Sequence, residues 1–270
     1  MARGRTADIK AKVLQGLLKT VTAVCLAAAL VGSGLFMCCA PFSTTALSNL
    51  FSNWQGSPFT HDELVKAAQA TLDYTVGSND RAKLFPVIYD INMSAKANGR
   101  ATNAGAPDLP DGGMPATDEL AARFSLAGES YVLTNDALSH LDDVYRVIST
   151  ARIVLIVLAV VGLAGLVVVG ITRGRRHVGI VVIVASIVVL ALFIALAGWI
   201  IVDFDGFFTA LHSLFFTAGT WEFSADSLLI RMYPENFWVG MGAIWLATSI
   251  LACVVGIILG RLIKGRKRAL

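Results

Sequence analysis

Residues 178–202 read VGIVVIVASIVVLALFIALAGWIIV, an apolar run of 25 residues without a charged side chain. A helix rises 1.5 Å per residue, so about 20 apolar residues cross the hydrocarbon core of a bilayer. This run is long enough to do so, and it predicts a membrane-spanning helix.

Three further stretches have the same character, namely residues 21–40, 153–172 and 237–260. None of the four contains Asp, Glu, Lys, Arg or His, so we expect no charge relay through the membrane centre, which argues against a pump. Of the 270 residues, 56% are hydrophobic and 15% are charged, and the mean hydropathy is +0.68. This composition excludes a water-soluble enzyme and favours an all-α integral membrane protein with four transmembrane helices.

The charged residues predict the orientation of the chain. Thirteen of the 22 Lys and Arg residues lie in residues 1–20, 173–177 and 261–270, whereas 18 of the 19 Asp and Glu residues lie in residues 41–152 and 203–236. Positive charge marks the cytoplasmic side. We therefore predict cytoplasmic N- and C-termini, a basic cytoplasmic turn at 173–177, and one large and one small extracytoplasmic segment. The net charge of +3 indicates neither a nucleic acid nor an acidic partner.

The four cysteines, Cys25, Cys38, Cys39 and Cys253, lie in apolar runs and have no metal-ligand spacing. We interpret them as small buried hydrophobic residues. The bulky Met37 disfavours a lipoprotein cleavage signal before Cys38, and the first apolar run is longer than a signal-peptide core, so an uncleaved anchor is predicted.

The large outer segment contains two predicted helices and one loop. Thr60 and Glu63 form a capping-box pattern followed by apolar residues at helical spacing. Residues 97–117 are rich in Gly, Pro, Asn and Asp, which predicts a flexible insertion. A second helix is predicted from Thr134 or Asn135 toward the second span. In the fourth span, Gly256 and Gly260 fit a helix-contact spacing, although glycine is frequent enough to produce it by chance.

Asp136, His140 and Asp143 are spaced four and three residues apart, which places them on one face of the second helix. A neighbouring carboxylate can fix the tautomer of an imidazole and stabilise its charged form, as a general base requires. Alternatively, these residues form a solvated helix face, to which we also assign Asp142. Spacing alone favours the solvated face.

The second outer segment places His212 among aromatic residues. In helical form Phe208, Phe215 and Phe216 lie four before, three after and four after His212, so the imidazole emerges from an aromatic interfacial surface. Burial there is expected to lower its pKa. A packed, hydrogen-bonded histidine is the alternative. His140 precedes the second span and His212 follows the third, so both are expected at the same outer interface.

The other histidines and the short motifs point to no further chemistry. His61 lies at a helix start, and His177 lies in the basic turn. Phosphate-binding glycine loops, HExxH and a serine nucleophile elbow are missing from the sequence.

The two histidine segments together resemble one family. LSHLDDV at 138–144, FTALHSLFF at 208–216, Trp221, and LLIRMYPENFW at 228–238 are similar to the outer-loop motifs of the bacterial lipoprotein intramolecular transacylase family, called Lit. That family has four spans with one large and one small outer loop. Leu141 stands where the family motif has Met, and residues 97–117 look like an insertion.

The resemblance implies that the sn-2 acyl chain of an S-diacylglyceryl cysteine moves to the α-amino group of that cysteine, which gives a lyso-form lipoprotein. Because ester and amine belong to one molecule, no covalent enzyme intermediate is required. Our hypothesis makes His140, oriented by Asp143, the general base and His212 the donor to the carbonyl or leaving oxygen; the two roles are interchangeable from sequence. Trp221, Phe208, Phe215 and Phe216 would line the acyl path, or form an interfacial aromatic belt.

The resemblance also implies diacylglyceryl lipoproteins and membrane lipid as partners, no cofactor, nucleotide or nucleic acid, and an active site on the extracytoplasmic side of the bacterial cytoplasmic membrane. Two other readings remain open. One is a metal-dependent membrane hydrolase with His140, His212 and Asp143 as ligands. The other is a non-catalytic membrane scaffold with structural histidines, which leads when the resemblance is set aside.

Overall fold

The computed structural model describes residues 2–102 and 104–265, and the side chains from residue 9 on within these ranges. Of the basic residues in the predicted cytoplasmic ends, Arg266, Lys267 and Arg268 and the side chains of Arg3 and Arg5 lie outside the described part.

The described chain contains helices and no strands, which confirms the all-α prediction. The helices are α1 (Ala2–Cys38), α2 (Pro41–Phe51), α3 (His61–Leu72), the π-helix η1 (Asp73–Gly77), α4 (Arg81–Ala97), α5 (Thr117–Phe124), α6 (Asn135–Arg173), α7 (Arg175–Val202), α8 (Phe204–Ser213), α9 (Leu228–Met232) and α10 (Glu235–Lys264). Four helices are long and apolar enough to cross a membrane: Ile9–Cys38 of α1, and α6, α7 and α10. The chain is thus a multi-pass membrane protein with four spans, as predicted.

The chain divides into two compact units. The first comprises Met1–Met37, Ala151–Phe204 and Trp245–Leu270, and the second comprises Cys38–Thr150 and Asp205–Ile244. The apolar part of α6 therefore belongs to the first unit, and its polar N-terminal part, which carries His140, belongs to the second.

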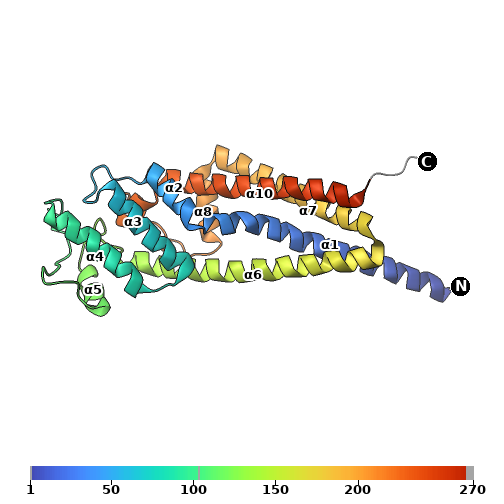
Figure 1. The fold of residues 1–270 in the computed structure, drawn as a ribbon, viewed down its shortest axis with the longest axis horizontal. Helices are drawn as coiled ribbons and strands as arrows, with labels where there is room; N and C mark the ends of the chain where they lie inside the picture. The colour runs from blue at the N-terminus through green and yellow to red at the C-terminus, as the bar shows by residue number, and fades with distance from the viewer. Residues whose placement is uncertain (1, 103, 266–270) are drawn as a thin grey trace. The chain divides into compact units, whose positions relative to one another are not determined.

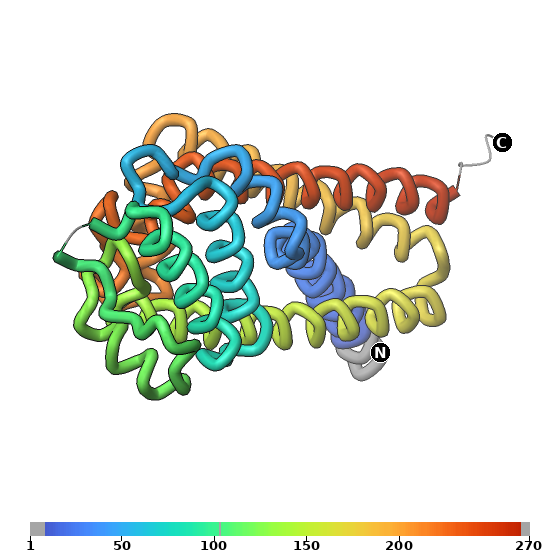
Figure 2. The backbone as a smooth tube through the Cα atoms, turned by 60° about the vertical axis from the view of Figure 1, so that its left-hand side comes forward, coloured from blue at the N-terminus to red at the C-terminus, as the bar shows by residue number. Residues whose placement is uncertain are grey.

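In the first unit, α1, α6, α7 and α10 run alongside one another (Figure 1). The turn between α6 and α7 lies at the same end of this unit as the C-terminal end of α10 (Figures 1 and 2). There, Nε of Arg175 donates a hydrogen bond of 3.0 Å to the carbonyl oxygen of Ile263. This shared end carries basic residues that the sequence analysis predicts to be cytoplasmic.

Small residues let α7 and α10 approach closely in the first unit. A Cβ atom on Gly260 would lie 2.7 Å from Cγ1 of Ile183, and one on Gly256 would lie 2.5 Å from Oγ of Ser186. Helices in lipid associate through such close packing. The sequence analysis noted that the spacing of Gly256 and Gly260 could arise by chance because glycine is frequent. In the structure both glycines lie at the contact between α10 and α7.

The second unit has one apolar core, in which α3 packs against α2, α4 and α9. The predicted capping box is present, because Thr60 accepts a hydrogen bond from the backbone of Glu63 and Glu63 accepts one from Thr60. The carboxylate of Glu63 also receives two hydrogen bonds from the guanidinium of Arg100, at 2.7 and 2.9 Å. Burial raises the pKa of Glu63, but the hydrogen bonds from Arg100, Ser94 and Thr60 together outweigh burial and lower the pKa to about 2.

The segment at 97–117 is irregular from Asn98 to Ala116, apart from Asn103, which lies outside the described residues. It is nevertheless attached to the core. Leu109 is buried, and Nζ of Lys96 donates to its carbonyl oxygen at 2.9 Å and to Asp111 at 2.7 Å. The segment thus contributes an apolar side chain to the second unit, although its composition suggested a loop without a core residue.

Candidate active site

The imidazoles of His140 and His212 face each other in the second unit. His140 lies in the second turn of α6, and His212 lies near the end of α8. Their ring centroids are 6.4 Å apart and their planes are inclined by 25°. Two side chains that are 72 positions apart in sequence therefore lie close enough to act on one small group.

Aromatic side chains surround the pair. Phe208 stacks on His212 with ring centroids 3.9 Å apart, and Trp221 lies 4.8 Å from the same imidazole. Phe216 contacts both histidines, at 4.8 Å from His140 and 5.7 Å from His212. The two histidines thus share an aromatic enclosure, whereas the sequence analysis expected aromatic neighbours for His212 only.

The end of α8 explains how Phe216 reaches His140. The helix stops at Ser213, and the next residues form a turn in which the backbone N–H of Phe216 donates 2.8 Å to the carbonyl oxygen of His212. Phe216 is drawn toward the histidines, whereas Phe215 is 55% exposed. The ring of Phe215 is 6.3 Å from Phe216. The sequence analysis assumed that the helix continues through residue 216, which would have placed Phe215 and Phe216 on the same face as His212.

His212 has a defined tautomer in its neutral form. Its Nδ1 lies 2.8 Å from the carbonyl oxygen of Phe208, and a carbonyl oxygen only accepts, so Nδ1 carries the proton and Nε2 has the free lone pair. Burial lowers the pKa of His212, while the bond to Phe208 opposes this shift. The imidazole is therefore neutral at neutral pH.

His140 is partly buried and lies within the membrane-length helix Asn135–Arg173. Its Nδ1 is buried and has no hydrogen-bond partner among the described residues. Burial, and then the nearby His212, lower the pKa of His140 to about 4, against a weaker opposing effect of Asp143. His140 is thus a neutral imidazole with an unsatisfied buried nitrogen.

Asp143 forms an ion pair with Arg146, with Oδ1 and Nη1 3.0 Å apart. Since Nδ1 of His140 is unpartnered, Asp143 does not orient the imidazole through that nitrogen. The negative charge of Asp143 opposes the lowering of the pKa of His140.

Asp142 does not lie on a solvated face, which corrects the sequence interpretation. Its carboxylate accepts hydrogen bonds from the hydroxyl of Tyr74, from Nδ2 of Asn79 at 3.1 Å and from Nη2 of Arg81 at 3.1 Å. The error arose because these partners come from η1 and the start of α4, more than sixty residues earlier in the chain.

Two site residues were missed by the sequence analysis. The ring of Phe223 lies 5.7 Å from His140, and that of Trp238 lies 6.2 Å from Phe208. Phe223 is only two residues after Trp221, so extending the aromatic pattern by one step would have found it.

A buried indole also belongs to the site. Nε1 of Trp221 is buried and has no hydrogen-bond partner in the described part of the chain. An unpaired buried donor costs about 1–3 kcal/mol unless something accepts its hydrogen bond. This donor and the unpaired nitrogen of His140 are therefore both available to a polar ligand atom.

The arrangement does not resemble a metal centre. No group of three or more His, Cys, Asp or Glu side chains within the described ranges is placed to hold a metal ion. The set of His140, His212 and Asp143 considered for a hydrolase is therefore not assembled. His61 and His177 lie apart from the site, with His61 against the carbonyl oxygen of Asn49 and His177 against that of Arg173.

Comparisons with known proteins support the resemblance. Residues 117–238, which include both histidines, match the family model described as "Lipoprotein intramolecular transacylase Lit". No curated protein matches the chain by sequence.

The fold is shared with solved structures. The chain is similar to the in meso structure of the membrane integral lipoprotein intramolecular transacylase Lit from Bacillus cereus, with 14% identity, a TM-score of 0.63, and coverage of 93% of this chain and 96% of that chain. Variants of that protein with a histidine replaced by arginine or alanine give TM-scores of 0.64 and 0.63, with 14% and 13% identity. They cover 96% and 94% of this chain and 96% of their own. At this identity the likeness establishes a common fold.

Proposed function

From the confirmed resemblance of residues 117–238 to the lipoprotein intramolecular transacylase family, we propose that this chain moves the sn-2 acyl chain of an S-diacylglyceryl cysteine onto the α-amino group of the same cysteine. The product is an N-acyl, S-monoacylglyceryl lipoprotein. The observation that carries the proposal is the 6.4 Å separation of the imidazoles of His140 and His212 inside an aromatic enclosure.

The reaction needs little more than two proton-handling groups. Amine and ester are held on one cysteine, and effective molarities of about 10⁵ M or more are reached when such groups are well oriented. The nitrogen attacks the ester carbonyl carbon, an N–C bond forms, and the bond from that carbon to the glyceryl oxygen breaks. A nucleophilic serine or cysteine is therefore unnecessary.

The general base in this proposal is His212, which reverses our initial assignment. The bond from Nδ1 to the carbonyl of Phe208 leaves Nε2 to accept a proton. Nε2 takes the proton from the attacking nitrogen and returns it to the departing glyceryl oxygen, so the proton balance closes within one turnover. A base of lowered pKa is also a better acid in the second half of this transfer.

The carbonyl oxygen gains negative charge during the attack and needs hydrogen-bond donors. His140, neutral because it is buried, and Trp221 both have ring nitrogens without partners in the described structure. Donors already placed in a dry site stabilise an oxyanion more strongly than water does. We assign these two side chains to the oxyanion, and the acyl path to Phe208, Phe216 and Trp221.

The proposed substrates are diacylglyceryl-modified lipoproteins in the bacterial cytoplasmic membrane. Their glyceryl esters lie at the membrane surface, and the predicted orientation puts residues 41–152 and 203–236, and thus both histidines, on the extracytoplasmic side. A lipid-anchored substrate on that side meets the site without leaving the bilayer.

The test is to express the chain in a bacterium that lacks lipoprotein N-acylation and to analyse lipoprotein N-terminal peptides by mass spectrometry. Because the acyl group moves within one molecule, substrate and product have the same mass, so fragment ions and amine labelling must distinguish them. The native chain is expected to give peptides with a blocked α-amine and an acyl-bearing nitrogen. His140→Ala and His212→Ala are expected to leave the amine free while inserting normally.

His177→Ala is the matched control, since this histidine lies in the first turn of α7, against the carbonyl oxygen of Arg173, and it should act like the native chain. Peptides that lose an acyl chain and keep a free amine would indicate a hydrolase instead. Unchanged diacylglyceryl peptides with the native chain would indicate a scaffold. N-acylation by both histidine variants would overturn the two-histidine mechanism.

A further inference from the structure

Five exposed cationic side chains lie at one end of the first unit. Arg173 ends α6, Arg175 and Arg176 begin α7, and Arg261 and Lys264 lie in the last turn of α10. The turn between α6 and α7 is found at the same end of this unit as the end of α10 (Figures 1 and 2). We call these five residues the basic cluster.

Direct contacts join the two sides of the basic cluster. Nε of Arg175 donates a hydrogen bond of 3.0 Å to the carbonyl oxygen of Ile263. A Cβ atom on Gly265 would lie 3.0 Å from Nη2 of Arg175, and one on Gly179 would lie 2.9 Å from Cβ of Lys264. The start of α7 therefore packs against the end of α10, with Arg175 and Lys264 at the contact.

No ion pair joins the basic cluster to a carboxylate among the described residues. In the described side chains of the first unit the one carboxylate is Asp203, which follows the far end of α7, about 42 Å of helix from Arg175. Asp8, the other acidic residue of this unit, lies outside the described side chains. In the second unit, by contrast, a partly buried cation such as Arg100 is paired with Glu63. The charge of the basic cluster therefore calls for an anion from outside the described chain.

Helix dipoles account for only part of the basic cluster. Arg173, Arg261 and Lys264 lie at the C-terminal ends of helices, where the negative end of the dipole stabilises a cation. Arg175 and Arg176 are the first two residues of α7, where the positive end of the dipole disfavours a cation. The first turn of α7 has no acidic residue. These two arginines therefore need a counter-ion more than the other three cations do.

The basic cluster is expected at the level of the lipid headgroups. Each of its five residues lies within four residues of the end of a predicted span, 153–172, 178–202 or 237–260, and headgroups lie just outside the hydrocarbon core that such spans cross. Because Nε of Arg175 is bound to Ile263, the plane of the guanidinium is fixed. Its two terminal amino groups remain for the oxygen atoms of one phosphate.

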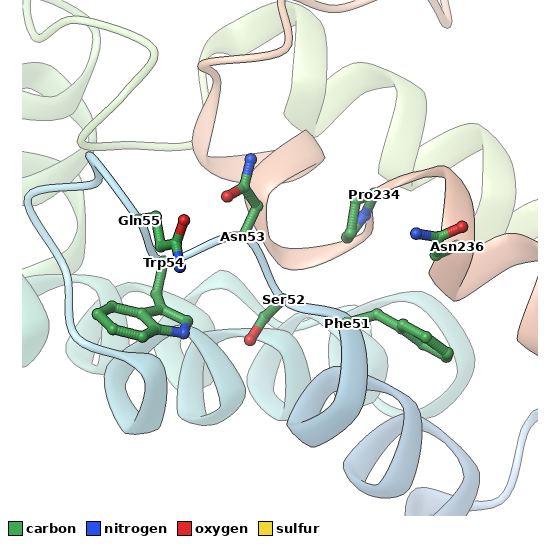
Figure 3. A pocket seen from close by; sticks show the side chains of 7 residues that line it. All are labelled: Phe51, Ser52, Asn53, Trp54, Gln55, Pro234 and Asn236. Atoms are coloured by element: carbon green, nitrogen blue, oxygen red, sulfur yellow. The ribbon is translucent and has the colours of Figure 1, made fainter.

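The pocket of the second unit has a different chemical character. It has a volume of about 270 Å³ and lies where the loop after α2 meets the segment between α9 and α10 (Figure 3). Its seven lining residues, all labelled in Figure 3, are uncharged. A phosphate group would therefore meet no cation in this pocket, whereas the basic cluster offers five.

We infer that the basic cluster binds the headgroup of an anionic phospholipid, such as phosphatidylglycerol, at the contact between α7 and α10. The phosphodiester of this lipid is negatively charged, and its headgroup lacks the cation that neutralises phosphatidylcholine. Basic groups between membrane helices suit such headgroups, and each Lys or Arg near the membrane surface strengthens binding about five-fold. The bound lipid joins the ends of α7 and α10 and stabilises the first unit. The inference does not depend on the proposed reaction.

The test measures lipid binding to the purified full-length chain in a nonionic detergent. Native mass spectrometry counts bound phosphatidylglycerol or phosphatidylcholine with the same acyl chains, and thermal unfolding is followed with each lipid. The native chain is expected to bind phosphatidylglycerol more tightly and to unfold at a higher temperature with it. Arg175→Gln/Lys264→Gln should weaken this binding roughly thirty-fold, because two cations are lost, and should leave the binding of phosphatidylcholine unchanged.

Lys10→Gln/Lys19→Gln is the matched control, because it removes the same charge from α1, outside the basic cluster. It should weaken the binding of phosphatidylglycerol less than about three-fold, since salt screens distant exposed charges. Arg175→Lys keeps the charge but loses the planar fork, so it should weaken binding about ten-fold. If the double variant in the cluster does not fold, Lys264→Gln alone should weaken binding about five-fold.

Four results would overturn the inference. Equal losses in the two double variants would mean that the cluster acts only as diffuse membrane-surface charge, and native binding by Arg175→Lys would mean the same. Equal affinity of the native chain for the two lipids would remove the anionic site. If inorganic phosphate alone raises the unfolding temperature as much as phosphatidylglycerol does, the site takes a dissolved anion instead of a lipid.

Discussion

The Nδ1–H of His212 donates a hydrogen bond of 2.8 Å to the carbonyl oxygen of Phe208. This single contact makes the two histidines chemically unequal, because His140 has no partner at Nδ1 among the described residues. His212 has a fixed tautomer with Nε2 free to accept a proton, whereas His140 is a buried neutral ring. Their protonation should therefore affect the reaction at different pH values.

The pH profile of kcat/KM should show the protonation of the substrate amine and the protonation of His212 as two separate steps. The substrate ammonium, with a pKa of about 8, must lose a proton before it attacks, so the rate falls below that pH with a slope of one. Burial lowers the pKa of His212 below the ordinary value of a histidine, so the base becomes protonated only at a pH below that ordinary value, and the slope steepens to two there. Initial rates measured from about pH 5 to 9 test this. A second acid limb above pH 6.5 would contradict a buried imidazole base.

Phe216 and Phe215 are neighbours with different surroundings and form a matched pair. Phe216 contacts both histidines, whereas Phe215 is mostly exposed. Each aromatic contact is worth about 0.5–1.5 kcal/mol beyond area burial, so Phe216→Ala should lower kcat/KM about ten-fold or more. Phe215→Ala should change it less than about three-fold. Equal losses in the two variants, measured on the same detergent-purified preparations, would indicate a general interfacial role for both rings.

Trp221 can be tested for a role as a hydrogen-bond donor. Trp221→Phe keeps an aromatic ring beside His212 but removes the buried Nε1–H. Removing one oxyanion donor typically costs 10²–10³ in kcat, so we expect a loss of about that size in kcat and a small change in KM. A variant that raises KM for long acyl chains and retains kcat would instead assign Trp221 to the acyl path alone.

Much of the fold follows directly from local sequence. An apolar run such as residues 178–202 must span a bilayer whatever its neighbours are, and the capping box at Thr60 and Glu63 involves residues three apart. Both predictions therefore hold in the structure. α4 was not predicted, and it contains Pro86 in its interior, where proline normally disfavours a helix.

The site depends on contacts that local patterns do not contain. Spacing placed His140 on a helix face but favoured a solvated face, because nothing near it in sequence indicates that His212 covers it. The predicted topology put both histidines at the same outer interface, and the family resemblance gave them a joint role, but their close approach appears only in the structure. The same reasoning failed for Asp142, since its partners Tyr74 and Arg81 are distant in sequence.

Asp142 holds the face of α6 opposite His140. Residues two apart on a helix are rotated by about 200°, so the carboxylate points away from the imidazole. Its bonds to Tyr74, Asn79 and Arg81 tie this turn of α6 to η1 and the start of α4. The turn of α6 that carries His140 is therefore held in place through its opposite face.

Asp142→Asn should consequently reduce both stability and activity, although Asp142 touches neither histidine by hydrogen bond. Asp142 is the less exposed partner of Arg81, which is itself 44% exposed, so loss of the charge on Asp142 costs about 1 kcal/mol. This lowers the unfolding temperature, and a looser α6 lowers kcat about ten-fold. Asp143→Asn is the matched control, because its pair with Arg146 is exposed and worth less than about 1 kcal/mol. The measurements are the unfolding temperature in detergent and the initial rate of acyl transfer for both variants. If Asp143→Asn has the larger effect on rate while the unfolding temperature is unchanged, then Asp143 orients His140 during catalysis, and the assignment of His212 as the base must be reversed.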